Sequence, residues 1–283
     1  MKIACFTVSL PDTPPEPSLR LLKKHGYEGA EWRVTTDKES TPLPGFWKGN
    51  RCTLQEDWSD AQFKAVADMA KNEGLAAPCL GSYTPAANLV MAKRMMEVAN
   101  IFGAPMLRIN FSKFDSSRPY PESFKRELDD YAKVVGAAKA YKVKPLIEIH
   151  MGNITPSASA AYRFVSHFQP SEVGVIHDAG NMVYEGFEDY KNGIELLGPY
   201  LAHVHVKNSM PVSEPSQGPA RLKWKTVFAP FRKGQVDFTA LLGALKRAGY
   251  GGWLSVEDFS TERPQEERLK DDIAFLREIL SSL

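Results

Sequence analysis

Three short apolar runs decide the fold of this chain: Lys144-Pro-Leu-Ile-Glu-Ile-His150, Val173-Gly-Val-Ile-His-Asp178 and Leu201-Ala-His-Val-His-Val-Lys207. Each run has the length of a β-strand and ends on ionisable side chains, and together they hold four of the six histidines. Alternate side chains of a strand share a face. Glu148 and His150 are therefore predicted to point together, as are His203, His205 and Lys207. Acid and imidazole groups gathered at the ends of buried strands indicate a divalent-metal site.

The rest of the chain repeats the alternation of strand and helix. Apolar runs predict strands at residues 2–8, 29–34, 75–82, 105–111, 144–150, 173–178, 201–207 and 252–259. Amphipathic segments that predict helices lie between them. Strict alternation implies a parallel sheet with helical crossovers. Eight such units in 283 residues fit a closed α/β barrel, the (β/α)8 TIM barrel, better than an open doubly wound sheet.

We therefore predict a single barrel domain over residues 1–283. The stretch 209–236, after the seventh strand, is predicted to be a long irregular loop and a candidate lid. Its basic and aromatic residues between 221 and 233 suit either an anion-binding lid or a solvated loop. The sequence contains no GxGxxG, P-loop, GxSxG or HExxH pattern, which argues against dinucleotide-binding, NTPase, α/β-hydrolase and zincin functions.

The composition indicates which kinds of molecule this protein is expected to bind. Lysine and arginine number 35 against 34 acidic residues, so the net charge is +1 and gives no general attraction to nucleic acid or anionic membrane. No apolar run reaches the length of a membrane span. The N-terminus reads directly as a strand without a leader. Cys5, Cys52 and Cys79 are far apart, as free thiols in a reducing compartment are. We expect a cytoplasmic protein that binds neither nucleic acid nor membrane.

The chemistry of a TIM barrel lies at the C-terminal ends of its strands. Those ends bring together one group from each of the last four strands: Glu148, Asp178, His205 and Glu257. Three carboxylates and one imidazole suit a single divalent cation, with manganese as the expected ion and magnesium, cobalt or zinc as alternatives. One acid at a strand end is more often a cap or an ion-pair partner than a ligand. Four on successive strand ends are hard to assign to structure alone.

Other polar residues near these ends are candidates for substrate contact. Asn181 and His150 are placed to reach a substrate, and Lys207 lies on the face of His205, one step further out. His203 is a further candidate, with support of a metal ligand, a position lower in the barrel or a direct bond to the metal as the alternatives.

Three charged residues of earlier strands are predicted to face the barrel interior: Glu31, Arg33 and Arg108. Because buried charges require partners, these residues either bind substrate or bond one another across the barrel. Arg108 is the one we assign to substrate. His177 faces away from Asp178 and is expected to be a hydrogen-bonded structural histidine.

At these residues the sequence resembles the sugar phosphate isomerase/epimerase superfamily of xylose-isomerase-like barrels, over nearly the whole chain. The most specific matches are Glu148-x-His150, Asp178-x-Gly-Asn181, His203-Val-His205-Val-Lys207 and Val-Glu257-Asp. The resemblance implies that the metal ligands are Glu148, Asp178, His205 and Glu257. It also implies that Glu148 and Glu257 act as an acid/base pair on opposite faces of the substrate. In members that eliminate or dehydrate a keto-sugar, a histidine such as His150 serves as an additional base.

The resemblance implies an isomerase or epimerase that removes a proton next to the carbonyl of a sugar or keto-sugar and forms an enediolate. The ketose 3-epimerases of the superfamily carry a histidine where this chain has Asn181, and an arginine shortly after the His-x-His pair, where it continues Lys207-Asn208-Ser209-Met210. These departures argue against 3-epimerisation of a free ketose. The alternative is a lyase of the same fold, which removes water or an aglycone β to a carbonyl.

Two further classes are weaker. An endonuclease IV-like DNA repair enzyme needs histidine ligands from the first half of the barrel, where this chain has only His25 on a predicted helix. A non-catalytic barrel does not require the four predicted ligands together. Assembly as a homo-oligomer or with a different subunit is compatible with aromatic loop residues such as Trp47 and Trp224.

Overall fold

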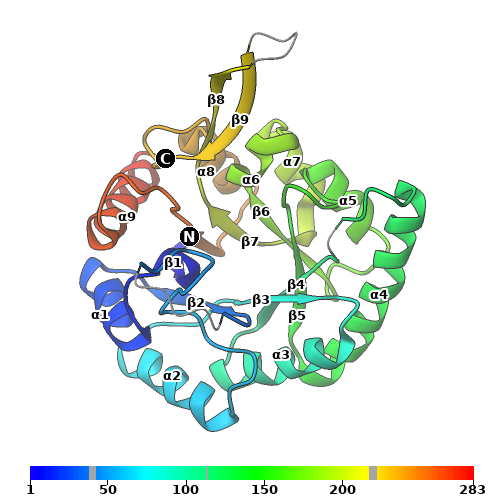
Figure 1. Cartoon of the computed structure of the whole chain (residues 1–283), viewed down its shortest axis with the longest axis horizontal. Coiled ribbons are helices and arrows are strands. Elements are labelled where there is room, and N and C mark those ends of the chain that lie inside the picture. The colour runs from blue at the N-terminus through cyan, green and yellow to red at the C-terminus, as the bar shows by residue number, and fades with distance from the viewer. Residues whose placement is uncertain (38–42, 113, 217–221) are drawn as a thin grey trace.

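The computed structural model describes residues 1–37, 43–112, 114–216 and 222–283. Its centre is a closed barrel of eight parallel strands in the order β1-β10-β7-β6-β5-β4-β3-β2, which confirms the predicted TIM barrel (Figure 1). The barrel strands are β1 (Lys2–Phe6), β2 (Gly29–Val34), β3 (Leu80–Pro85), β4 (Met106–Asn110), β5 (Lys144–Glu148), β6 (Gly174–Asp178), β7 (Leu201–Val206) and β10 (Trp253–Val256).

Helices form the outer ring around the barrel (Figure 1). They are α1 (Pro15–His25), α2 (Asp60–Asn72), α3 (Leu89–Phe102), α4 (Tyr120–Tyr141), α5 (Ala158–Val165), α6 (Ala179–Glu185), α7 (Tyr190–Leu197), α8 (Phe238–Arg247) and α9 (Gln265–Ser282). Several begin at a side chain that accepts a backbone N–H, as Ser59 does for α2 in a capping box with Gln62. None of the helices in the described ranges combines the length and apolar character needed to cross a bilayer.

The strands divide their side chains between two layers. Ile147 and Val204 lie in the large apolar cluster that extends into the helical ring. Leu146 and Ile176 take the other face and form a small cluster with Cys79. The predicted alternation along the strands is therefore confirmed, and it leaves the ends of the inward face to polar groups.

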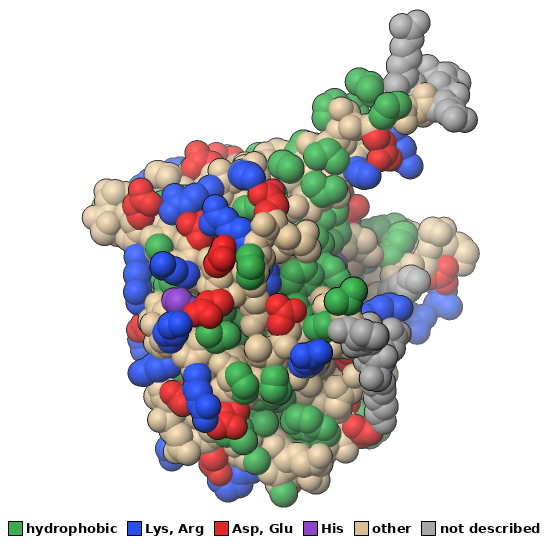
Figure 2. Space-filling view, turned by 60° about the vertical axis from the view of Figure 1, so that its left-hand side comes forward, with side chains coloured by type: hydrophobic (Ala, Val, Ile, Leu, Met, Phe, Trp, Pro, Cys, Tyr) green, Lys and Arg blue, Asp and Glu red, His purple; other side chains and the backbone are tan. Residues whose placement is uncertain are grey.

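The stretch 209–236 is not irregular, and this prediction was wrong. It contains β8 (Ser209–Pro215) and β9 (Leu222–Phe228), which pair as an antiparallel two-stranded sheet. This hairpin projects beyond the barrel (Figure 2), with Leu222 53% and Trp224 65% exposed. Residue 221, the first of the basic residues assigned to a lid, lies outside the described residues.

The start of the third strand also differs from expectation, and the sixth strand leads directly into a helix. The third strand begins at Leu80 instead of residue 75, because the segment before it makes only an isolated bridge, between Gly29 and Ala76. Helix α6 follows β6 without a loop, and Asp178 caps it by accepting the backbone N–H of Asn181 at 2.9 Å. This cap turns the chain sharply at the rim of the barrel.

Gly81 allows the barrel interior to close around Phe6. A Cβ atom at Gly81 would lie 2.3 Å from the ring of Phe6, which packs against His205 at 5.4 Å between centroids. Gly81→Ala is therefore expected to destabilise the protein by about 1–3 kcal/mol in urea unfolding, since Phe6 must move. The control is Gly136→Ala in α4, where an added Cβ meets nothing within 4 Å. That variant should gain about 0.5–1 kcal/mol, and equal stability of the two variants would contradict the packing argument.

Candidate active site

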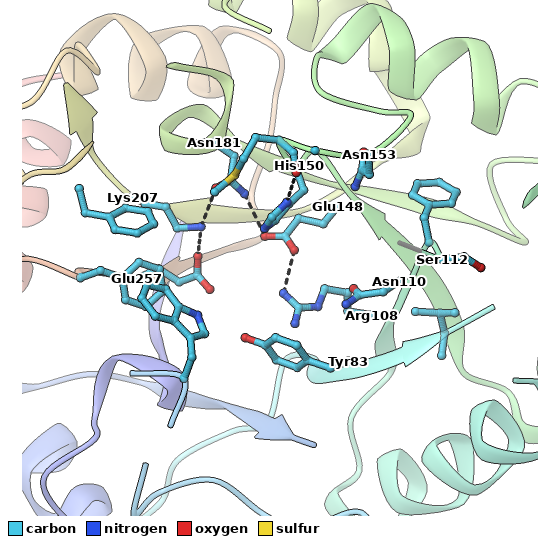
Figure 3. A pocket seen from close by; sticks show the side chains of 17 residues that line it. Tyr83, Arg108, Asn110, Ser112, Glu148, His150, Asn153, Asn181, Lys207 and Glu257 are labelled. Carbon is cyan, nitrogen blue, oxygen red and sulfur yellow. Dashed lines mark hydrogen bonds and ion pairs between the residues drawn. The ribbon is translucent and has the colours of Figure 1, made fainter. Parts of the chain in front are cut away.

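A cavity of about 430 Å³ opens at the C-terminal ends of the barrel strands. Polar groups project into it from several strand ends, among them Glu148, His150, Lys207 and Glu257 (Figure 3). Part of its wall is aromatic and is made by Trp47, Tyr83, Phe228 and Phe259. A single concave site at this end of the barrel has both the polar groups and the apolar wall that a small-molecule site requires.

The four predicted ligand residues converge beside this cavity. Each offers one ligand atom, and these atoms lie within 4.8 Å of one another. The Nδ1 atom of His205 lies 3.0 Å from Glu148, 3.6 Å from Glu257 and 3.8 Å from Asp178. Glu148 and Asp178 are the last residues of β5 and β6, and His205 is the next-to-last residue of β7. Glu257 follows directly after β10. The register of the parallel strands explains this convergence. His205 on β7 stands beside Asp178 on β6 and, on its other side, beside Ser255 on β10, two residues before Glu257.

Two buried cations hold these carboxylates. Arg108 donates from Nη1 to Glu148 Oε2 at 2.7 Å. Lys207 donates to Asp178 Oδ2 at 2.7 Å and also pairs with Glu257. Burial alone would raise the pKa of Glu148, but Arg108 and His205 outweigh it and hold that pKa well below its usual range. Burial, with Glu257 and Glu148 nearby, raises the pKa of Asp178 despite Lys207.

The charge and chemistry of the donor set fit a divalent ion. Four carboxylates lie around His205: Glu31, Glu148, Asp178 and Glu257. Two cations pair with three of them, Arg108 with Glu148 and Lys207 with Asp178 and Glu257. With the imidazoles neutral, as a histidine ligand must be, four negative and two positive charges leave a net charge of −2. One divalent cation balances that charge. Carboxylate oxygens with one imidazole nitrogen form a donor set for manganese, magnesium, cobalt or zinc.

Three of the residues predicted to meet substrate line the cavity: Asn181, Lys207 and Arg108. Asn181 donates to the Ile149 carbonyl at 3.1 Å and accepts from Lys207 at 3.1 Å, so its amide is held in place. Arg108 keeps one unused donor, because Nη2 has no hydrogen-bond partner among the described residues. His150 also lines the cavity, and its Nδ1 donates to the Met151 carbonyl at 2.6 Å.

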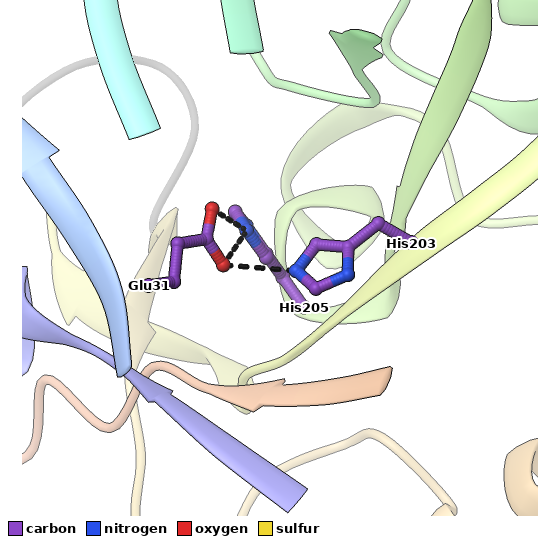
Figure 4. A group of neighbouring side chains, drawn as sticks. All are labelled: Glu31, His203 and His205. Carbon is purple, nitrogen blue, oxygen red and sulfur yellow. Dashed lines mark hydrogen bonds and ion pairs between the residues drawn. The ribbon is translucent and has the colours of Figure 1, made fainter. Parts of the chain in front are cut away.

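His203 is not at the cavity. It is fully buried, and its Nε2 lies 2.9 Å from Glu31 Oε2 (Figure 4). It stands two residues before His205 on β7 and therefore lies lower in the barrel. Glu31 also lies 3.2 Å from Nε2 of His205. Burial alone would raise the pKa of Glu31, but the two histidines lower it below its usual range.

The expectation for His177 was wrong, and one of the two alternatives for the inward charges of the early strands does not occur among the described residues. His177 is fully buried, and neither ring nitrogen has a hydrogen-bond partner among the described residues; burial lowers its pKa to about 4. The inward charges of the early strands do not bond one another. Arg33 pairs with Asp37 at 3.0 Å, while Arg108 and Glu31 pair with residues of the second half of the barrel.

Sequence reasoning did not assign the aromatic wall to the site. The rings of Trp47 and Phe259 have centroids 4.8 Å apart, and the Phe228 ring lies 4.9 Å from that of Phe259. These residues come from three different loops or strand ends, so no local motif joins them. The available signal was the number of aromatic residues in the two long connections after the second and seventh strands.

Known proteins share this architecture. A curated relative, an inosose dehydratase of Geobacillus thermodenitrificans (strain NG80-2), is 29% identical over 129 residues, which is 43% of each chain. The chain thus spans less than half the length of that relative. Among solved structures, the IOLI protein with a bound zinc atom has a TM-score of 0.74 at 20% identity, covering 100% of this chain and 99% of that one. The apo form of 3-keto-D-glucoside 4-epimerase, YcjR, from E. coli has a TM-score of 0.73 at 16% identity, covering 98% and 99%.

The solved structures are too distant in sequence to show more than the fold. Both an elimination enzyme and an epimerase occur among these proteins, and one of them holds a metal ion. The family model described as xylose isomerase-like TIM barrel matches residues 19–279. Since that match spans nearly the whole chain, the protein belongs to the xylose isomerase-like TIM barrel family.

Proposed function

We propose that this protein is a divalent-metal-dependent isomerase or epimerase of an uncharged sugar or keto-sugar. The observation that carries the proposal is the convergence of Glu148, Asp178, His205 and Glu257, whose ligand atoms lie within 4.8 Å of one another beside the cavity. A cation bound by these residues would supply the positive charge that stabilises an enediolate. Manganese is the ion we expect, with magnesium, cobalt and zinc as alternatives.

The proton transfers are assigned to Glu148 and Glu257. Both line the cavity; Glu148 ends β5 and Glu257 follows β10, and β6 and β7 separate these two strands in the barrel. Two carboxylates that approach from separate strands can reach opposite faces of one substrate carbon. Because Arg108 keeps Glu148 ionised, its carboxylate is in the form that accepts a proton from the carbon next to the carbonyl. The other glutamate then returns a proton from its own side.

The charges around the cavity favour an uncharged substrate. Among the described lining residues, the lysine and arginine side chains are Lys207 and Arg108, and each is held by a carboxylate. A phosphate or carboxylate group of a substrate would have to displace one of these buried ion pairs, which is costly. Hydroxyl groups require no such displacement. The cavity wall offers them uncharged polar side chains such as Asn110 and Asn153.

The aromatic wall supports a ring-shaped substrate. Trp47, Phe228 and Phe259 form one apolar surface on the cavity, which polar groups of β4 and β5 also line. A pyranose or cyclitol ring has an apolar C–H face and a hydroxylated rim, so it can pack on this wall while its hydroxyls meet the polar side.

A lyase is the second candidate, and one observation favours it. His150 lines the cavity next to Glu148 and is half-buried, so a third proton-transfer group stands within reach of the substrate. Loss of water or of an aglycone β to a carbonyl requires such a group to protonate the leaving oxygen. The relation to an inosose dehydratase agrees with this reading.

The experiment that tests the proposal is incubation in deuterium oxide with manganese and a panel of ketoses, 3-keto-glycosides and inososes. After the manganese is removed by chelation, proton NMR and mass spectrometry are recorded. We expect deuterium at a carbon next to the carbonyl with the mass otherwise unchanged, and formation of an epimer or isomer. Loss of water or of an aglycone would assign the lyase instead. If the metal-loaded protein exchanged no proton on any of these compounds, the proposed chemistry would be wrong.

A further inference from the structure

Glu31 is a buried carboxylate that the proposed chemistry does not use. It stands on β2, which β1 and β10 separate from β7 in the barrel, and it is 0% exposed. It does not line the cavity, and no lysine or arginine of the described residues pairs with it. A buried, ionised carboxylate without a cationic partner is costly, so its hydrogen bonds to other groups must stabilise it.

Those bonds go to the two histidines of β7 (Figure 4). His205 Nε2 lies 3.2 Å from both carboxylate oxygens of Glu31. His203 Nε2 lies 2.9 Å from Oε2. The other nitrogen of His203 has no hydrogen-bond partner among the described residues, so Nε2 is the nitrogen that carries the shared proton. His203 thereby fixes the carboxylate that faces His205.

The two nitrogens of His205 face different surroundings. Nε2 points to Glu31, whereas Nδ1 points to the carboxylates of Glu148, Glu257 and Asp178. Carboxylates therefore lie on both sides of the ring, and a cation bound among the acids would take the place of a proton at Nδ1. A neutral imidazole carries one proton, and Glu31 is then the carboxylate that holds it, on Nε2, with the lone pair of Nδ1 left for the cation. This is the tautomer that a metal ligand at Nδ1 needs.

We propose that Glu31 is a positioning residue that holds His205 in the tautomer and orientation that offer Nδ1 to the divalent cation, with His203 holding Glu31 in turn. The inference rests on the proposed metal centre. A carboxylate that accepts from the far nitrogen of a histidine ligand orients the ring and raises its basicity.

An alternative use of the same atoms is a second metal site, because Glu31, His203 and His205 also offer ligand atoms within 4.8 Å of one another. The cavity includes neither Glu31 nor His203 among its lining residues, whereas Glu148 and Glu257 of the four-residue cluster line it. We therefore favour the positioning role, and the number of bound ions distinguishes the two.

The test measures manganese binding to the metal-free full chain by calorimetry and by the electron paramagnetic resonance of free manganese. The wild type should bind one ion per chain, and Glu31→Gln should also bind one, with the affinity weakened by ~10–100-fold. Glu31→Asp keeps the carboxylate and should recover part of the loss. The control is Glu127→Gln, which removes a buried carboxylate on α4 and should leave the affinity unchanged.

A second readout reports the tautomer directly. Long-range proton–nitrogen NMR of the histidine rings is recorded in the zinc-loaded wild type and in zinc-loaded Glu31→Gln, because zinc is diamagnetic and would occupy Nδ1 of His205. The wild type should show the proton of His205 on Nε2, strongly deshielded by the Glu31 carboxylate, and the variant should lose that deshielding. Equal manganese affinity and an unchanged ring pattern in Glu31→Gln would overturn the inference and leave the metal centre standing. Two ions per wild-type chain and one in the variant would make Glu31 a ligand instead. A wild type that binds no divalent metal would overturn the proposed function itself.

Discussion

Glutamine in place of Glu148 or of Glu257 is expected to lower kcat by on the order of 10²–10⁴-fold, because the amide can neither accept nor return the proton. Each glutamate lines the cavity and belongs to the group of four ligand residues, so each variant also tests the metal centre. The fold should survive, since an amide keeps the size of the side chain. The measurement is kcat with saturating metal and substrate, with far-ultraviolet circular dichroism as the check on folding.

Isotope exchange separates the two roles. In deuterium oxide, the variant that keeps the glutamate on the side of the departing proton should still exchange that proton but form no epimer. The other variant should show neither exchange nor epimer. Metal occupancy is measured in both, so that loss of the ion is not mistaken for loss of the base. Near-normal turnover in either variant would refute the acid/base assignment, whatever the metal content.

The positions that meet beside the cavity could be predicted because they depend on short-range rules. Strand periodicity decides which side chains share a face, and the barrel fold decides which ends meet. These two rules were sufficient to predict that four residues lie close together, and their ligand atoms do so in the structure: Glu148, Asp178, His205 and Glu257. Their roles as ligands and as proton-transfer groups stay predictions, as do the cytoplasmic location and the oligomeric state.

The pairings across the barrel could not be predicted from the sequence. Glu31 and His205 are 174 positions apart, and Arg108 and Glu148 are 40 apart. Periodicity shows that such residues face inward, but which of several inward charges become partners depends on strand order and register. His177 shows the same limit, because the expected hydrogen bond required a partner, and neither ring nitrogen has one within the part of the chain that the structure describes.

The sequence of the β8–β9 hairpin contains features that argue against strands and features that favour them. Pro211 and Pro215 lie in β8, and proline normally argues against a strand because it cannot donate to the ladder. In a two-stranded sheet each strand has a free edge, where a missing donor costs little. The alternation in Leu222-Lys-Trp-Lys-Thr-Val-Phe228 was the signal that indicated a strand.

Asparagine in place of Asp178 is expected to weaken manganese binding by more than ~100-fold while the protein stays folded. The two carboxylate oxygens of Asp178 have different partners. Oδ1 accepts the backbone N–H of Asn181 and caps α6, whereas Oδ2 faces Lys207 and His205. Asparagine caps a helix about as well as aspartate, so only the charge at the metal centre is lost. Loss of residues that merely support a ligand costs ~10–100-fold in affinity, and loss of a ligand should cost more.

Asp178→Ala is the matched variant, because it removes the cap as well as the charge. It should bind manganese as poorly as Asp178→Asn and should also lose about 0.5–2 kcal/mol of stability relative to it, since the first turn of α6 loses its acceptor. Manganese titration and urea unfolding of the metal-free proteins measure the two effects. If Asp178→Asn kept wild-type affinity, Asp178 would be only a helix cap and ion-pair partner, and the metal centre would lack one of its proposed ligands. If both variants lost affinity but had equal stability, the capping contribution would be refuted and the metal assignment would stand.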